Sequence, residues 1–347
     1  GIVYTGGGAF SGTGGNGGKP RAIYVLDRGN VTQPKDQVAP GALSSLSQLD
    51  KWFELPEGHT EADRRAALAH WLADDRNPLT WRSIVNRVWQ YHFGRGIVET
   101  ANDLGRMGSE PTHPELLDWL AVEFRDGGQS LKALHKLMVT SHTYRQVSNS
   151  PGEVSDLDPG SLDADNRYLW RANRRRLEAE AIRDVVLQVS GKLDLTMGGP
   201  SFQDFVIEHP EHSPHYEYHL HDPEDPRSHR RSIYRFLVRS QPQPFMSTLD
   251  CADPSMRVDK RNESLSPLQA LALLNNGFMV TMSKHFAKRL ESDSQDRSVQ
   301  INTMFELAIG RAPQPDERDA LEAYSKEHGL ENTCRLVFNL NEFSFVD

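Results

Sequence analysis

A helix with clear start and stop signals is encoded by residues 77–94, which read NPLTWRSIVNRVWQYHFG. Asn77 is a favourable N-cap residue, Pro78 suits the first helical position, and Gly94 suits the position just after a helix. Apolar residues between them recur at the spacing of one helical face, namely Ile84, Val85, Val88 and Trp89. The stretch therefore predicts an amphipathic helix that buries one face.

The same start and stop signals recur along most of the chain from Thr60 onward. They predict helices over residues 60–73, 114–127, 130–141, 176–190, 266–277, 278–290, 301–309, 315–328 and 333–340. Helices that each carry one apolar face must pack on one another to bury it. We therefore expect a mainly α-helical fold built of two packed helical subdomains.

Three segments depart from this helical pattern. Residues 1–45 combine a Gly-rich loop with a strand near Ala22–Leu26, and residues 149–166 are polar and rich in helix breakers, as a linker would be. Residues 198–262 are rich in proline and histidine and predict a small β or irregular insert. The expected order is a connector with a strand (1–45), a helical subdomain (46–148), a linker (149–166) and a second helical subdomain (167–347) that carries the insert.

Composition and charge exclude several classes of protein. The 347 residues are 37% hydrophobic and carry 39 Lys and Arg against 48 Asp and Glu, a net charge of −9. An acidic chain is a poor fit to general nucleic-acid binding, and no apolar run approaches the roughly 20 residues of a membrane span. The two cysteines, Cys251 and Cys334, form no C-x-x-C pair, so no covalent haem attachment is expected in this chain.

A glycine-rich nucleotide motif is also disfavoured. Residues 12–17 read GTGGNG and match G-x-G-x-x-G, but a strand follows them where a phosphate-binding loop requires a helix. A flexible loop is therefore favoured over a nucleotide site.

Six histidines lie within residues 209–229, interleaved with acidic residues. Imidazoles oriented by carboxylates are typical ligands of zinc, copper or iron. A transition-metal site is one hypothesis, with His209, His212, His219 and His221 as its ligands. The alternative is a solvated acidic loop whose histidines form local hydrogen bonds.

A basic segment follows directly. Arg231, Arg235 and Arg239 recur every four residues, which places them on one face of either a strand or a helix. Guanidinium groups suit carboxylate, sulfate or phosphate, so these three are predicted to bind anions together with Arg257 and Arg261. The alternative is that these arginines pair with acidic residues inside the protein.

Candidate acid and base groups lie beside the arginines. Asp250 and Asp253 could act as the carboxylate pair of a glycan hydrolase, and His215 could take part as an acid or a base. Neither the spacing nor a motif defines a reaction, so enzymatic activity stays open.

Several runs of sequence resemble one family, and they read NPLT (77–80), VNRVW (85–89), HFGRG (92–96), PTHPELLD (111–118), RRRLEAE (174–180) and LQAL (268–271). From about Thr60 to Asp347 the chain resembles a planctomycete C-terminal domain of unknown function, found in large exported proteins together with a planctomycete cytochrome c-like domain. Residues 1–45 are similar to the connector before it. The resemblance implies a periplasmic or extracellular location, an upstream cytochrome c-like domain of the same polypeptide as a partner, and a lineage rich in enzymes for sulfated polysaccharides.

Three functions follow as hypotheses. The first is binding or processing of an anionic glycan, sulfated or uronic, through the arginine face beside the histidine-rich loop. The second is electron transfer or docking for a cytochrome c domain, with the histidines as metal ligands. The third is a helical scaffold that stabilises a larger exported polypeptide.

Overall fold

The computed structural model describes residues 22–148, 159–209, 213–256 and 258–346. The chain divides into two compact units, which we call unit 1 (residues 1–145) and unit 2 (residues 146–347). Across the described residues, thirteen α-helices accompany three small two-stranded sheets, which confirms the mainly α class. The predicted Gly-rich loop lies in residues 1–21, outside this part of the chain.

Unit 1 begins with an antiparallel hairpin of strands β1 (Ile23–Asp27) and β2 (Asn30–Val38). The first strand was predicted from its apolar run. The second was missed because its sequence, NVTQPKDQV, is polar and contains Pro34. Nearly every residue of the hairpin is exposed, so no alternation of buried residues marks it in the sequence.

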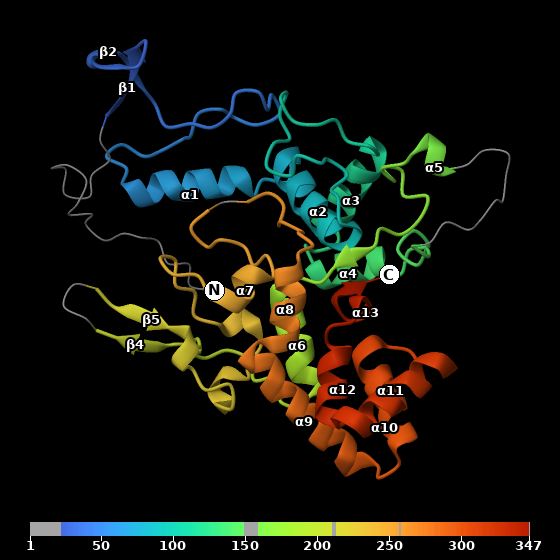
Figure 1. Ribbon diagram of the computed structural model, residues 1–347. Helices are drawn as coiled ribbons and strands as arrows, with labels where there is room; N and C mark the ends of the chain where they lie inside the picture. The colour runs from blue at the N-terminus through green and yellow to red at the C-terminus, as the bar shows by residue number, and fades with distance from the viewer. Residues whose placement is uncertain (1–21, 149–158, 210–212, 257, 347) are drawn as a thin grey trace. The chain divides into compact units, whose positions relative to one another are not determined.

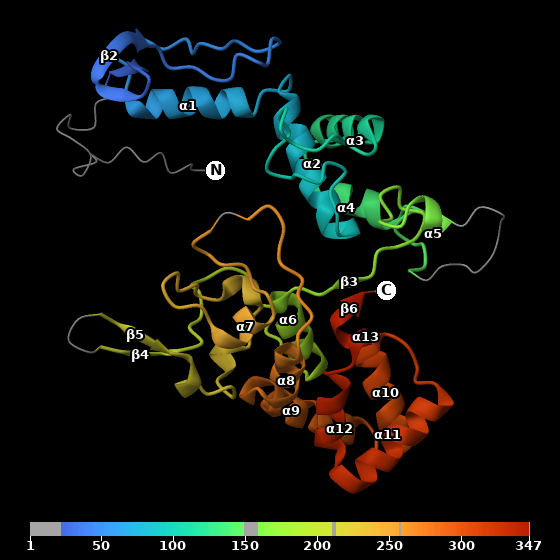
Figure 2. The same cartoon turned by 45° about the horizontal axis from the view of Figure 1, so that its top comes forward.

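Four helices form the rest of unit 1, in the order α1 (Glu61–Leu72), α2 (Pro78–Phe93), α3 (Pro114–Asp126) and α4 (Leu131–Val139). Their ends follow the predicted signals: the Asn77 side chain accepts a hydrogen bond from the Leu79 N–H, and Gly94 takes a left-handed conformation at φ 80°. Helix α2 packs against α3 and α4, and its Trp81, Val85 and Trp89 are buried (Figure 2).

Unit 2 is built around the helices α6 (Ala179–Val189), α9 (Gly277–Asp293), α10 (Arg297–Ile309), α11 (Pro315–His328) and α12 (Leu330–Val337) (Figure 1). Its apolar core joins Ile182 and Val186 of α6 to Met282 and Phe286 of α9 and to Phe338. Shorter helices complete the unit: α5 (Pro159–Leu162), α7 (Pro244–Thr248), α8 (Pro267–Asn275) and α13 (Asn341–Ser344). Residues 149–158 of the predicted linker lie outside the described residues, and α5 begins directly after them.

A short antiparallel pair joins distant parts of unit 2. Strand β3 (Arg175–Arg176) pairs with β6 (Phe345–Val346), and the Leu177 N–H donates to the Ser344 carbonyl at 2.7 Å (Figure 2). The pair fixes the chain just before α6 to the segment just after α13.

The insert at 198–262 is irregular, as predicted. It holds the antiparallel pair β4 (Val206–Glu208) and β5 (His215–Glu217) and three single 3-10 turns, Tyr218–Leu220, Pro226–Ser228 and Ser232–Tyr234. The apolar run at 233–238 begins in the last of these turns, and its one β-type contact among the described residues is an isolated bridge between Phe202 and Arg235.

Candidate functional site

A pocket of about 470 Å³ lies where the insert meets the starts of α7 and α9. We call it the Asp204 pocket. Its polar lining includes Arg183, Asp204, His221 and Asn276, and its apolar lining includes Phe245 and Phe278. A few polar groups on a largely apolar wall, in a hollow of this volume, are typical of small-molecule sites.

Three charged side chains are buried here: Arg183 and Asp204 line the pocket, and Arg235 pairs with Asp204. Asp204 is 7% exposed, Arg183 6% and Arg235 8%. The Arg235 guanidinium lies 3.8 Å from the Asp204 carboxylate. Arg183 donates hydrogen bonds to the backbone carbonyls of Ser228 and Arg230, and its guanidinium lies 5.0 Å from the centre of the Phe202 ring. Charges this deeply buried must be matched by opposite charges or hydrogen bonds.

The match is incomplete at Asp204. Among the described residues, Oδ1 of Asp204 and Nε of Arg235 are buried without a hydrogen-bond partner. Burial raises the pKa of Asp204, against the attraction of Arg235 and Arg183. Burial also lowers the pKa of Arg183 to about 10, which still leaves it charged at neutral pH. An unpartnered buried polar atom in a native fold calls for an explanation, and a bound ligand provides one.

His221 and Tyr218 line the same pocket. Burial lowers the pKa of His221, so its imidazole is neutral near pH 7, where one ring nitrogen donates and the other accepts. Burial raises the pKa of Tyr218 to about 12, and its hydroxyl donates to the Gln241 carbonyl at 2.8 Å. Tyr218 is therefore a fixed wall of the pocket, whereas His221 has hydrogen-bonding capacity for a ligand.

The N-terminus of α9 also faces the pocket, through Asn276, Gly277 and Phe278. Asn276 is the N-cap and accepts a hydrogen bond from the Phe278 N–H. The first N–H groups of a helix have no partner inside the helix, and the helix dipole places partial positive charge there. The pocket thus combines the Arg183 guanidinium, which lies 3.6 Å from the Asp184 carboxylate, and the partial positive charge of α9 with the carboxylate of Asp204.

The predicted arginine face does not form. The chain from Arg231 to Arg239 is neither a strand nor an α-helix, so the four-residue spacing does not place its arginines together. Arg235 is buried against Asp204, whereas Arg231 and Arg239 are exposed. Arg261 pairs with Glu178 and Glu180, and Arg257 lies outside the described residues.

The predicted acid and base groups lie apart. Asp250 is held by the Ser264 hydroxyl at 2.9 Å and the Gln269 amide at 3.0 Å, with the Arg176 guanidinium 3.5 Å away. Asp253 is exposed and accepts bonds from Ser255. His215 is exposed in β5, and among the described contacts nothing joins these three groups. Asp250 therefore acts structurally, as the anchor of the loop before α8.

The predicted metal site is not found in the described residues, which contain no cluster of three or more His, Cys, Asp or Glu side chains that could hold a metal. His209 is exposed after β4, His219 lies 3.2 Å from Glu217, and His221 lines the Asp204 pocket. His212 lies outside the described residues. His209, His219 and His221 therefore form no such cluster in the irregular insert.

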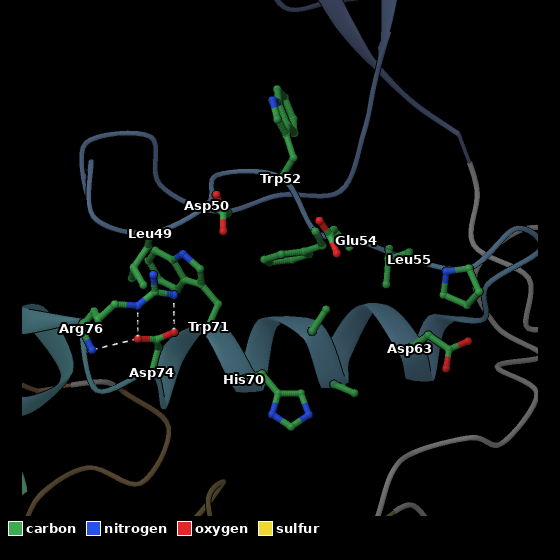
Figure 3. Close-up of a pocket in the computed structure, with 14 residues that line it drawn as sticks. Leu49, Asp50, Trp52, Glu54, Leu55, Asp63, His70, Trp71, Asp74 and Arg76 are labelled. Atoms are coloured by element: carbon green, nitrogen blue, oxygen red, sulfur yellow. Dashed lines mark hydrogen bonds and ion pairs between the residues drawn. The ribbon is translucent and has the colours of Figure 1, made fainter.

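Unit 1 has a groove of its own, of about 480 Å³, between residues 49–56 and α1 (Figure 3). Trp52 points away from α1 there, and the Asp74 carboxylate is paired with Arg76. Asp63 is likewise used, because it closes the capping box with Thr60. Two carboxylates of this groove, those of Asp63 and Asp74, are therefore already engaged, so the Asp204 pocket is the stronger candidate site.

The comparisons with known proteins identify a family and nothing beyond it. Residues 64–325 match the sequence model of PSD1, a protein of unknown function (DUF1553). The chain belongs to the PSD1 family. No curated protein and no solved structure matches it.

In this PSD1 chain, sequence reasoning missed Asp204 and Arg183 and identified some of their neighbours. Arg235, His219 and His221 were predicted as functional; His219 and His221 line the pocket, and Arg235 pairs with Asp204. A signal for Asp204 was present, because the residue stands between Phe202 and Phe205 in the run SFQDFVI. A lone carboxylate in an apolar run is expected to be buried and matched.

Proposed function

We propose that unit 2 binds an anionic polysaccharide, sulfated or uronic, in the Asp204 pocket. The observation that carries the proposal is the buried, unpartnered Oδ1 of Asp204 beside a cationic wall. A carboxylate oxygen accepts hydrogen bonds, and the hydroxyl groups of a sugar donate them. Arg183 and the α9 N-terminus suit a carboxylate or sulfate group on the same sugar.

The rest of the pocket supports a sugar ligand. Phe245 and Phe278 give an apolar surface for a ring, and the neutral imidazole of His221 can both donate and accept a hydrogen bond. Arg231 and Arg239 are exposed on the same insert and add charge that a long polyanion can reach.

The test is a binding measurement with polygalacturonate, chondroitin sulfate and neutral dextran at low and high salt. We expect the two anionic polymers to bind, dextran not to bind, and salt to weaken the binding. Absence of binding by both anionic polymers at low salt, or equal binding of dextran, would overturn the proposal.

A variant that keeps the N-cap of α9 tests whether the ligand binds in the Asp204 pocket. Asn276→Asp keeps a good N-cap for α9 and adds a negative charge to the pocket wall. We expect it to weaken anionic-polymer binding about tenfold or more, because like charges repel. The control is Ser130→Asp, which makes a similar exchange at the N-cap of α4 in unit 1 and should leave binding unchanged. Equal effects of the two variants would place the site elsewhere.

We also propose a periplasmic or extracellular location and an upstream cytochrome c-like domain in the same polypeptide. The resemblance supports both, and a polysaccharide ligand agrees with such a location. Electron transfer through histidine-bound metal lacks supporting geometry among the described residues, because they hold no cluster of metal-binding side chains.

A further inference from the structure

A second pocket adjoins the first at one residue. It measures about 730 Å³ and is lined by residues that include Gln203, Phe205, Val206, Leu220 and Arg230. We call it the Leu220 pocket. His221 lines both pockets, and among the described residues no other does.

Two segments divide their side chains between the pockets. In residues 218–222, Tyr218 and His219 line the Asp204 pocket, while Leu220 and Asp222 line the Leu220 pocket. Residues 202–206 behave alike, because Asp204 lines the first pocket and its neighbours line the second. The two pockets therefore share one wall, and His221 contributes to the lining on both sides of that wall.

Charged groups of both pockets act on His221. The carboxylate of Asp204 acts on its imidazole from one pocket, and those of Asp222 and Asp225 act on it from the other. The half-buried ring is thus influenced by charged groups of both pockets, Arg183 included.

The Leu220 pocket has the chemistry of a second sugar site. Leu220 is 48% exposed and Val206 42%, which leaves an apolar surface open to a ring. Ser201 and Gln203 add neutral hydrogen-bonding groups. The charged lining is mixed. Arg227 is paired with Asp225 at 2.7 Å, and Arg230 donates to the backbone carbonyls of Pro200 and Thr196. The carboxylates of Asp194 and Asp222 can accept hydrogen bonds from sugar hydroxyls. Apolar surface bordered by a few polar groups is what a carbohydrate ring needs from its site.

We propose that the Asp204 and Leu220 pockets are adjacent subsites for one anionic polysaccharide chain, which His221 contacts where it passes from one to the other. This inference rests on the proposed function and adds that the ligand is recognised over more than one sugar residue. A neutral imidazole can donate to one sugar and accept from the next. The ligand class is then a polymer or oligomer, not a free sugar acid.

The experiment compares oligomers of increasing length on the whole chain. Oligogalacturonates of one, two and six residues, and chondroitin sulfate oligosaccharides of two and six residues, are titrated by calorimetry. In whichever series binds, we expect the longest oligomer to bind about tenfold or more tighter than the shortest, since two linked sites act together.

A filling variant tests the second subsite separately. Gln203 is exposed at the Leu220 pocket, so Gln203→Trp can occupy that pocket with little demand on the core. We expect it to abolish the gain from length and to leave the affinity for the shortest oligomer unchanged. The matched control is Gln295→Trp, at an exposed glutamine after α9, which should change neither affinity.

The outcomes separate the two proposals. Binding that does not depend on length, or equal weakening of short and long oligomers by Gln203→Trp, overturns the second subsite and leaves the proposed function standing. Absence of binding by every probe overturns both.

Discussion

The guanidinium of Arg235 lies 3.8 Å from the carboxylate of Asp204, and both side chains are buried. This pair joins two separate segments of the insert, because Asp204 precedes β4 and Arg235 follows the last 3-10 turn. Burial of the pair costs free energy, and removal of one partner costs more, since the other partner would then be a buried charge without compensation.

Removal of one partner should therefore destabilise unit 2. We expect Asp204→Ala to lower the free energy of unfolding by about 3 kcal/mol. The control Asp222→Ala removes an exposed carboxylate that accepts a hydrogen bond from the Glu224 N–H, and it should change the free energy of unfolding by less than about 1 kcal/mol. Urea denaturation of both variants provides the measurement. Equal stability of the two would mean that the buried pair contributes nothing.

Substitutions of Asp250 and Asp253 should likewise differ in how much they lower the free energy of unfolding. Asp250 accepts bonds from Ser264 and Gln269 beside the buried Arg176, so Asp250→Ala should cost about 2–4 kcal/mol. Asp253→Ala removes an exposed group and should cost less than about 1 kcal/mol. The φ of Asp250 is 63°, a conformation that Asn tolerates, so Asp250→Asn should be milder than Asp250→Ala. Thermal unfolding of the three variants checks this order.

The buried side chain of Asn86 joins α2 to the loop that follows it in unit 1. Its side chain donates to the Val98 carbonyl and accepts from the Val98 N–H, both at 2.9 Å. Asn86→Ala leaves two buried backbone groups without partners and should cost about 3 kcal/mol. Hydrogen exchange should then accelerate in α2 and α3, whereas Glu123→Ala at an exposed position of α3 should leave it unchanged. Unchanged exchange in Asn86→Ala would contradict this role.

The acid stability of unit 2 should depend on Glu317. Hydrogen bonds from Arg311 lower the pKa of Glu317 to about 2, from an ordinary value of 4.5. Because the unfolded chain takes up its proton first, the pair stabilises the fold fully above about pH 4.5 and loses this contribution as the pH falls toward 2. The two side chains are about one-third exposed, so the effect is at most about 1 kcal/mol.

The comparison of Glu317→Gln with wild type tests this pH dependence. The variant should be less stable at pH 6, and the difference should vanish near pH 2. Asp319→Asn, at an exposed position of the same helix, should show no such pH-dependent difference. A constant difference at all pH values would show that Glu317 acts through something other than its charge.

The helices of this fold could be predicted because their signals are local. Asn77, Pro78 and Gly94 act within one or two turns of the helix they delimit, and α2 has the expected ends. The hairpin strand β2 could not be predicted, because its pairing with β1 depends on no buried face.

The candidate site was predicted only in part, because it depends on an irregular backbone. The rule that residues four apart share a face holds for regular helices and strands, and the segment that carries Arg231 and Arg235 is neither. Asp204 and Arg235 meet through the bridge between Phe202 and Arg235, a contact that no local spacing encodes.

The pairing of β3 with β6 has a consequence for synthesis of the protein. Arg175 and Arg176 leave the ribosome long before Phe345 and Val346, and α6 directly follows the waiting strand. Contacts between distant positions form late, and an incomplete domain exposes apolar surface meanwhile. The apolar face of α6 can be buried against α9 and α10 as soon as these helices have been made, whereas β3 finds its partner only after translation has passed Val346.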